Sequence, residues 1–394
     1  MTQTEGLAKI NVEIKDIVSK KMDVFYNIRM KENRDLTILL LNCLDKKEMK
    51  IMSPLAGSGV REIRFLKELK EDNIKKIIIN DYSKNAYNLI KENLELNNIK
   101  YNEDTEEKSN SEEKNKHEEN IKVIVQNLDA NKCIIENLGF DFAEIDPFGN
   151  PNPFLNNIIL GLSRGGILAI TATDTSSLCG TYKKTCMRHY FATPLNCYLK
   201  HELGVRILIR KVQLIGAQFE KALTPIFSYA KEHYMRVFFI CEKQKTATDN
   251  IIKQHKFLSL NEKDGTYKWG IHGQNNTDDN NDNNKIQKTH TLIGPMWSGE
   301  LWDKELVNKM CESDEKESKL NNKKENKLLH TIKNEMNYPP LYYNTHILSK
   351  LNGQAYPPKS DGFDTTHFDK HCVKSNLTPK EFIEQHIKKQ RETK

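Results

Sequence analysis

Apolar and polar residues alternate along the chain in a pattern that predicts strands and helices in turn. Short apolar stretches of the kind that form buried strands end near Ala56, Asp81, Asp129, Asp146 and Asp174. After each of the first four, apolar residues recur three or four positions apart, which is typical of an amphipathic helix. Successive strand–helix units predict a parallel sheet with right-handed crossovers.

The end of this sheet is expected to differ from its beginning. Residues 203–220 predict a long helix, and residues 226–230 and 234–241 predict an antiparallel hairpin after it. The basic residues of the helix, which we interpret as a solvated face, are Arg206, Arg210 and Lys211.

The pattern of apolar and polar residues becomes weaker after the hairpin, which suggests that the chain has three parts. These are a domain at residues 1–245 with an N-terminal extension, a low-complexity connector at 246–290 with an Asn/Asp tract, and a second, smaller α/β domain at 291–394. Residues 102–120, rich in Glu, Asn and Lys, predict a disordered acidic insertion in the first domain.

Composition narrows the range of partners. The 394 residues carry a net charge of +6, and the rest of the chain is more basic than this because residues 102–120 are acidic. A basic body favours a polyanion such as nucleic acid. The eight cysteines include no C-x-x-C pair, no apolar run could span a membrane, and the N-terminus lacks an apolar signal core. We therefore expect a reduced, cytoplasmic protein without a cysteine metal site.

Glycines and acids follow the strands at the edge where ligands bind in open α/β sheets. The first strand leads into Gly57 and Gly59, which let backbone approach a ligand closely. Asp81, 22 residues after Gly59, could accept both hydroxyls of a ribose, and Asp129 could accept an adenine amine. Each acid could instead cap a helix. Acids after consecutive strands favour a shared ligand, either a dinucleotide or S-adenosylmethionine.

Asp146, Pro147, Phe148 and Gly149 follow the fourth strand and cannot continue it, because proline lacks a ladder donor. They could form a simple turn in which Asp146 caps its own backbone. The hairpin and this Asp-Pro-aromatic sequence resemble S-adenosylmethionine-dependent methyltransferases that act on exocyclic amines. In that chemistry the Asp146 carboxylate and the Pro147 carbonyl accept the two N–H bonds of a base amine, and Phe148 stacks on the base.

Further stretches make the resemblance more specific. They are F-Y-N-I-R-M-K-E-N-R-D at 25–35, G-S-G-V-R-E-I-R-F at 57–65, E-I-D-P-F-G at 144–149, T-A-T-D-T-S-S-L-C-G at 171–180, G-P-M-W-S-G-E-L-W-D at 294–303 and Y-Y-N-T-H at 342–346. Over nearly its whole length the chain resembles the tRNA (guanine-26, N2) dimethyltransferase family in its archaeal form. The resemblance implies a class I methyltransferase that transfers one or two methyl groups from S-adenosylmethionine to the N2 amine of guanine 26 in tRNA.

The resemblance also implies site residues. The implied cofactor-binding residues are Arg34, Arg64, Asp81, Asp129 and Ala130, to which the glycine turn adds Gly57 and Gly59. Asp146 is expected at the reacting amine. Arg61, one helical turn before Arg64, is the alternative cofactor arginine. Lys183 and Arg188 are expected to contact phosphate of the tRNA substrate.

The chain departs from this family in two respects. Ile28 stands where many members have proline, which allows a slightly different shape of the N-terminal cofactor loop. Many members carry paired C-x-x-C cysteines after the hairpin, as a structural zinc site requires. Only Cys241 stands in that region here, so we expect no metal. Residues 291–394 are expected to bind the rest of the tRNA by its shape, and no obligate protein partner is expected.

Other functions stay open on the residues alone. One is an amino-methyltransferase that acts on adenine N6 or on guanine N2 at another site. A second is a nucleotide-binding module or dehydrogenase, which leaves the D-P-F-G turn and the hairpin without a role. A third is a tRNA-binding protein without catalysis, for which the acids after the strands have no use.

The acidic insertion gives the first testable prediction. Deleting residues 102–120 removes no candidate site residue, so we expect tRNA methylation to be unchanged. Incorporation of labelled methyl groups into tRNA measures the effect. Loss of incorporation in a folded deletion variant would contradict the prediction.

Overall fold

The computed structural model describes residues 2–12, 24, 26–103, 121–262, 266–270, 290–322, 324–352, 364–378, 381 and 384. Residues 104–120 of the predicted acidic insertion and the whole Asn/Asp tract lie outside the described residues. Asn102 and Glu103, which the prediction of a disordered insertion included, instead form a short strand, and Glu103 accepts hydrogen bonds from Tyr87 and Lys91. Contacts within the chain define two compact units. The first comprises Met1–Thr171 and Phe238–Lys243, and the second comprises Ala172–Val237 and Gln244–Lys394. The domain boundaries predicted from the sequence stay a proposal.

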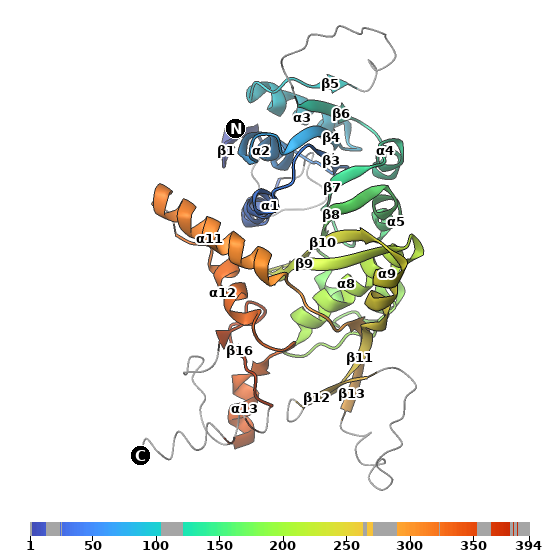
Figure 1. Ribbon diagram of the computed structural model, residues 1–394, viewed down its shortest axis with the longest axis vertical. Coiled ribbons are helices and arrows are strands. Elements are labelled where there is room, and N and C mark those ends of the chain that lie inside the picture. Colours follow the sequence, from blue (N-terminus) through green and yellow to red (C-terminus); the bar gives the residue numbers. More distant parts are fainter. Residues whose placement is uncertain are drawn as a thin grey trace. The chain divides into compact units, whose positions relative to one another are not determined.

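The centre of the fold is one eight-stranded sheet with the order β5-β6-β4-β3-β7-β8-β10-β9 (Figure 1). Its strands are β3 (Met49–Ser53), β4 (Ile74–Asn80), β5 (Asn102–Glu103), β6 (Lys122–Gln126), β7 (Phe140–Ile145), β8 (Leu162–Ala172), β9 (Lys221–Lys231) and β10 (Tyr234–Lys243). Neighbours from β5 to β8 pair in parallel. Only two residues join β9 to β10, a connection that antiparallel neighbours allow. The predicted parallel sheet that ends in an antiparallel hairpin is therefore confirmed.

The strand order reverses beside β3. The chain moves from β3 through β4 to β6, and it then returns to the other side of β3 to form β7 and β8. Ligands of open α/β sheets bind at such a reversal, outside the carboxyl ends of the strands. The topology therefore directs attention to the loops that follow β3 and β7.

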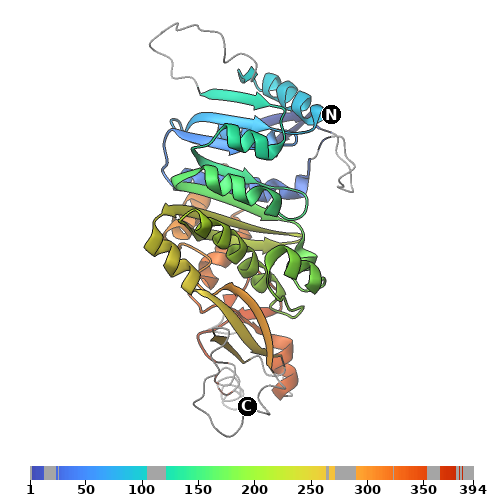
Figure 2. The ribbon, with the colours of Figure 1, turned by 90° about the vertical axis from the view of Figure 1, so that its right-hand side faces the viewer.

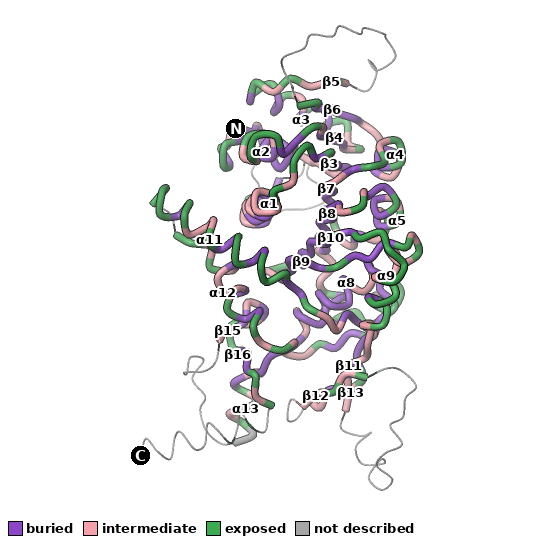
Figure 3. Tube along the Cα trace, viewed as in Figure 1, coloured by how far each residue is buried: buried purple, intermediate pink, exposed green. Residues whose placement is uncertain are grey.

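Helices cover both faces of the parallel strands (Figures 1 and 2). The helices on one face are α1 (Lys31–Cys43), α2 (Val60–Glu68) and α3 (Lys84–Leu96), and those on the other are α4 (Ala130–Glu136) and α5 (Asn152–Gly161). A short 3-10 helix, η1 (Ile28–Met30), precedes α1, and the N-terminal hairpin of β1 (Thr2–Glu5) and β2 (Ala8–Asn11) packs on α2 and α3. Because both faces are covered, the central strands are buried (Figure 3).

The second unit contains helices and two small antiparallel sheets with the strand orders β12-β11-β13 and β14-β16-β15. The helices are α6 (Thr175–Leu178), α7 (Lys183–Tyr190), α8 (Lys200–Gln218), α9 (Lys245–Lys253), α11 (Lys304–Asn321), α12 (Lys327–Glu335) and α13 (Thr345–Asn352). The strands are β11 (His255–Asn261), β12 (Tyr267–Gly270), β13 (His290–Trp297), β14 (Tyr343–Asn344), β15 (Asp364–Thr365) and β16 (Cys372–Lys374). The structure thus places α9, β11 and β12 in the segment 246–290, for which the weak pattern had suggested a connector.

One expectation from the helix pattern was wrong. Arg206 does not belong to a solvated face, because its side chain is buried in α8. Its guanidinium donates to Oε1 of Glu202, one turn earlier, and to the backbone carbonyl of Gly299 at 2.8 Å. Lys374 of β16 also donates to Glu202, at 3.3 Å. Periodicity could not reveal this burial, because two of these partners are distant in the sequence.

This buried ion group gives a prediction about stability. Burial alone would raise the pKa of Glu202, but Lys374, Arg206 and a backbone N–H lower it to about 2. Glu202→Gln leaves the two cations buried without a counter-charge, which costs roughly 3–5 kcal/mol in free energy of unfolding near neutral pH. A carboxylate with a depressed pKa stabilises the fold fully above pH 4.5 and loses this effect as the pH falls toward 2. In urea denaturation, the difference in free energy of unfolding between the wild type and Glu202→Gln should therefore be smaller at acid pH than at neutral pH.

Glu312→Gln is the matched control, because Glu312 is exposed on α11. Its free energy of unfolding should equal that of the wild type at every pH tested. A Glu202→Gln variant as stable as this control would contradict the assignment.

Candidate active site

The parallel strands bring the predicted site residues to one edge of the sheet. The loops at this edge follow β3, β4, β6 and β7, and they carry the glycine turn, Asp81, Asp129 and Asp146 in that order. Since β3 lies between β4 and β7, the glycine turn lies between the loops of Asp81 and Asp146.

Asp81 fixes the glycine turn directly. The backbone N–H of Gly57 donates to Asp81 Oδ2 at 2.9 Å, and that of Ser83 donates to Oδ1 at 2.9 Å. Burial raises the pKa of Asp81 above its ordinary value, although these two hydrogen bonds act in the opposite direction. Gly59 has φ of +75°, and a Cβ at this position would lie 3.3 Å from the Ile90 side chain. Glycine is therefore required where the turn meets α3.

Asn80, the last residue of β4, is a site residue that the sequence analysis did not select. Its buried side-chain amide donates to the backbone carbonyls of Pro54 and Leu128, each at 3.0 Å. Its Oδ1 accepts from the N–H of Leu128 at 2.9 Å, and its carbonyl accepts from the N–H of Ala56. Asn80 thus joins the loops after β3 and β6. A polar residue at the end of an apolar strand was the available signal.

Asp129 is the N-cap of α4. Its Oδ1 accepts from the N–H groups of Asn131 and Lys132 at 2.9 and 3.3 Å, so the alternative of helix capping is what the structure shows. Capping engages one carboxylate oxygen, and Asp129 is exposed. Ala130, the first residue of α4, is buried. Their binding of a cofactor stays a prediction.

Asp146 forms an ion pair with Arg61 of α2. The guanidinium Nη2 donates to Asp146 Oδ2 at 2.7 Å, and Nη1 donates to Asn33 Oδ1 at 2.9 Å and lies 3.6 Å from Glu144 Oε2. The Asp146 carboxylate is thereby held by one oxygen, and Oδ1 has no hydrogen bond among the described residues. Of the two arginines weighed on α2, Arg61 is the one that contacts the candidate catalytic acid.

The rest of the D-P-F-G sequence forms the turn that the sequence predicts. Pro147 is buried, whereas the Phe148 side chain is 42% exposed. Gly149 has φ of +96°, which favours glycine and ends the turn. An exposed aromatic ring next to a carboxylate can receive a planar base.

Glu62 is a second titratable residue beneath this edge that the sequence analysis did not select. It is fully buried, and it accepts a hydrogen bond from the hydroxyl of Ser53 at the end of β3. Burial raises the pKa of Glu62 to about 7, although Ser53 and Arg61 both favour the charged form. A buried carboxyl group with a raised pKa therefore lies next to Arg61 in α2.

Arg34 and Arg64 both form ion pairs with Glu5 rather than with Asp146. Arg34 Nε donates to Glu5 Oε1 at 2.6 Å, and Arg64 Nη1 donates to the same oxygen at 3.0 Å. Burial would raise the pKa of Glu5, but the two arginines lower it to about 2. No hydrogen bond or ion pair joins either arginine to Gly57 or Asp81 in the described part of the chain. Their role in cofactor binding stays a prediction.

Lys183 and Arg188 lie on α7, in the second unit, and both are exposed. Their contact with phosphate stays a prediction. Within the described residues, no helix has the length and apolar character needed to cross a membrane. In the same residues, no three His, Cys, Asp or Glu side chains are grouped as a metal ion would require, and the expectation that no zinc binds stays a prediction.

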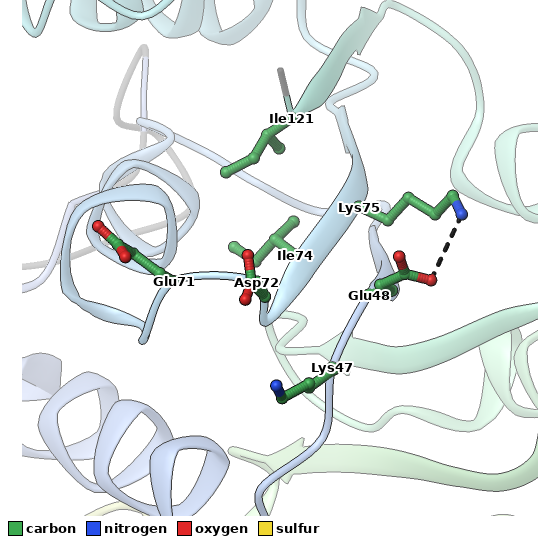
Figure 4. Close-up of a pocket in the computed structure, with 7 residues that line it drawn as sticks. All are labelled: Lys47, Glu48, Glu71, Asp72, Ile74, Lys75 and Ile121. Atoms are coloured by element: carbon green, nitrogen blue, oxygen red, sulfur yellow. Dashed lines mark hydrogen bonds and ion pairs between the residues drawn. The ribbon is translucent and has the colours of Figure 1, made fainter. Parts of the chain in front are cut away.

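A concavity of about 710 Å³ lies at the opposite ends of the strands (Figure 4). It is lined by Lys47, Glu48, Glu71, Asp72, Ile74, Lys75 and Ile121. Glu48 and Ile74 stand at the amino ends of β3 and β4, and Lys75 pairs with Glu48 at 3.5 Å. No predicted site residue lines it. Because ligands of such sheets bind at the carboxyl ends, the concavity is not the candidate active site.

Comparisons with known proteins identify the family of this chain. The family model described as N2,N2-dimethylguanosine tRNA methyltransferase matches residues 6–386. A tRNA (guanine(26)-N(2)/guanine(27)-N(2))-dimethyltransferase of Aquifex aeolicus is 37% identical over 96% of this chain and 94% of its own. A tRNA (guanine(26)-N(2))-dimethyltransferase of Methanobrevibacter smithii is 34% identical over 97% of this chain and 96% of its own.

A solved structure, that of Trm1 from Pyrococcus horikoshii in complex with S-adenosyl-L-methionine, matches this chain with a TM-score of 0.79 and 29% sequence identity. The match covers 98% of this chain and 99% of that one. The family model and the relatives likewise match nearly from end to end, and this chain therefore belongs to the N2,N2-dimethylguanosine tRNA methyltransferase family.

Proposed function

We propose that this chain transfers one or two methyl groups from S-adenosylmethionine to the N2 amine of guanine 26 in tRNA. The observation that carries the proposal is the Asp146-Pro147-Phe148 turn after β7, next to the glycine turn after β3. Family membership supports the reaction and the cofactor. The individual residue roles rest on the geometry of the carboxyl edge.

The loops after β3, β4 and β6 would hold the cofactor. S-adenosylmethionine supplies an electrophilic methyl group on a positively charged sulfur. Gly57 and Gly59 allow the backbone to approach it, and Asp81 would accept the ribose hydroxyls. Ala130 would offer a flat, buried wall to the adenine, with Asp129 accepting the adenine amine.

Asp146 would act on the guanine amine as an acceptor. The amine nitrogen is a weak nucleophile because its lone pair is delocalised into the ring. When Asp146 Oδ1 and the Pro147 carbonyl accept its two N–H bonds, the nitrogen becomes more tetrahedral and its lone pair points at the methyl group. The new N–C bond forms as the S–C bond breaks, and the nitrogen then loses a proton. Positioning supplies most of the rate enhancement in such a site.

Arg61 would orient Asp146 for this role. The Arg61 guanidinium engages Oδ2 at 2.7 Å, which leaves Oδ1 for the amine. Phe148 would stack on the guanine after it has left its helix.

A second methylation position has one observation in its favour. The name of the Aquifex aeolicus relative gives guanine 27 as well as guanine 26. The two nucleotides are neighbours, so one pocket could receive either of them. We therefore propose guanine 27 as the second candidate position.

The remaining expectations complete the proposal. Lys183 and Arg188 would bind phosphates of the tRNA, and residues 291–394 would hold its body. The reaction would take place in the cytoplasm, where tRNA serves translation, without an obligate protein partner. Residues 1–245 would form the catalytic domain and 246–290 the segment that connects it to the C-terminal domain.

The reaction can be tested by incubating the full chain with labelled methyl donor and unmodified tRNA, followed by digestion to nucleosides. N2-methylguanosine or N2,N2-dimethylguanosine at position 26 is expected. Methylated adenine would favour the alternative amino-methyltransferase, and absence of incorporation would contradict the proposal.

Removing the acceptor gives a prediction about catalysis. Asp146→Ala should reduce methyl transfer to background, because neither Oδ1 nor the ion pair with Arg61 remains. Its dissociation constant for S-adenosylmethionine, measured by calorimetry, should stay within about threefold of the wild type. Full activity in this variant would exclude Asp146 from the mechanism.

Removing the charge at Asp81 gives a prediction about the cofactor. Asp81→Asn keeps the shape but weakens charged hydrogen bonds, each worth about 1.5–3 kcal/mol. We expect the dissociation constant for S-adenosylmethionine to rise roughly 10- to 100-fold. Asp72→Asn, in the concavity at the opposite end of the same strand, is the matched control and should change nothing. A larger rise in this dissociation constant for Asp72→Asn than for Asp81→Asn would indicate that the cofactor binds at the amino ends of the strands, and it would contradict the proposal.

A further inference from the structure

Helix α7 carries an exposed face that is both basic and aromatic. We call this face, with the residue just before the helix, the α7 surface. Its members are Tyr182, Lys183, Lys184, Met187, Arg188 and Phe191, all of them exposed. From Lys183 onward they follow helical spacing on one side, whereas Cys186 and Tyr190 are buried on the other. Apolar side chains as exposed as Tyr182 (61%) and Phe191 (60%) do not stabilise the core.

The buried side of α7 is held in place by Asp174. The Tyr190 hydroxyl donates to Asp174 Oδ1 at 2.7 Å, and the Ser177 hydroxyl donates to Oδ2 at 2.8 Å. Both oxygens of this carboxylate are thus engaged at the base of the helix. The α7 surface is therefore presented by a fixed helix.

Phe191 has a backbone conformation that is unfavourable for a phenylalanine. It ends α7 with φ of +51°, in the left-handed region that glycine and asparagine adopt most easily. The cost for another residue is of the order of 1–2 kcal/mol. A ring that is 60% exposed recovers little of this cost through burial. The ring is therefore better explained by contact with a ligand than by stability.

Two cations of α8 contact Phe191 and have no acidic partner in the part of the chain that the structure describes. Lys211 Nζ lies 5.1 Å from the centre of the Phe191 ring, and Arg210 Nη1 donates to the Phe191 carbonyl at 3.4 Å. Both are half-buried, and burial lowers the pKa of each. Neither forms an ion pair with any described residue, and Arg210 Nε has no hydrogen-bond partner there. Partly desolvated cations of this kind are stabilised by an anion.

The α7 surface adds further positive charge. Lys183, Lys184 and Arg188 form no ion pair within the described residues. Together with Arg210 and Lys211, both of which contact Phe191, they bring five cations to this part of the second unit. A surface of this composition matches a single-stranded nucleic acid, whose phosphates bind cations and whose bases stack on rings.

We propose that the α7 surface, with Arg210 and Lys211, binds an unpaired nucleotide of the tRNA. The base stacks on Phe191, and the cations bind the phosphates on either side of it. The inference rests on the proposed function, because that function makes tRNA the substrate. It goes further by assigning a base-stacking site to α7, beyond the phosphate contacts expected of Lys183 and Arg188.

The decisive variant is Phe191→Asn in the full chain. Asparagine tolerates the left-handed conformation, so the melting temperature should equal or exceed that of the wild type. Loss of one stacked base should raise the dissociation constant for unmodified tRNA roughly 5- to 150-fold. The KM for tRNA should rise accordingly, with kcat at saturating tRNA and affinity for S-adenosylmethionine unchanged. Phe191→Tyr should restore tRNA binding.

A second variant tests the phosphate contact. Arg210→Met removes an unpaired, half-buried charge and should not destabilise the fold. It should weaken tRNA binding and reduce the slope of log affinity against log salt concentration by about one phosphate contact. Ile252→Asn and Lys253→Met, at the exposed end of α9 in the same unit and outside residues 291–394, are the matched controls and should bind tRNA as the wild type does.

The outcomes separate the inference from the proposed function. If the wild type methylates tRNA but Phe191→Asn binds tRNA no worse than Ile252→Asn does, the α7 site is excluded. A stable Phe191→Asn variant with weakened tRNA binding, rescued by Phe191→Tyr, supports it. A wild-type chain that methylates no tRNA overturns the proposed function, and with it the substrate on which the α7 site rests.

Discussion

The candidate site depends on how one side-chain amide joins the loops at the carboxyl edge of the sheet. Asn80 donates to the carbonyls of Pro54 and Leu128 and accepts from the N–H of Leu128, so the loops after β3 and β6 are fixed relative to β4. The next residue, Asp81, holds the glycine turn through the N–H of Gly57. Parallel strands bring these loops to the same edge, but they do not set the shape of the loops. Two adjacent polar side chains provide that shape, and a buried amide is stable here because its donors and acceptors are satisfied.

The electrostatic environment of each acid at the same edge depends on whether an arginine lies beside it. Arg61 lies among several acids and pairs most closely with Asp146. Among the described residues no cation lies within hydrogen-bond distance of the buried Glu62, and burial raises its pKa to about 7. The proposed acceptor Asp146 thus has a guanidinium partner, whereas burial shifts the neighbouring Glu62 toward its neutral form. Arg34 and Arg64 both bind Glu5, which ties the N-terminal hairpin to α1 and α2, and Arg64 also pairs with Asp35 and Glu68 at 2.7 Å each.

The second unit shows two outcomes for cations on one helix. Arg206 is fully buried on α8, and Glu202 and two backbone carbonyls neutralise and solvate it. One turn later Arg210 is half-buried with no acid beside it among the described residues, and Lys211 lies against an exposed ring. The first arrangement stabilises the fold through partners within the chain, so it needs no ligand. In the second arrangement, two partly desolvated cations have no counter-charge among the described residues, so a bound anion would stabilise them.

The sequence by itself determined the order of strands and helices, the terminal hairpin and the acids after the strands, because these follow from periodicity and from turn residues. It also determined that Asp146-Pro147-Phe148 leaves the sheet at the end of a strand. It did not reveal Asn80 as the residue that joins the loops, Glu62 as a buried acid, or Arg61 as the partner of Asp146. It also led us to place Arg206 in solvent. Only the tertiary structure decided these points, because each depends on a partner 20 or more residues away or on burial, and a polar residue has the same local pattern whether it faces water or a distant partner.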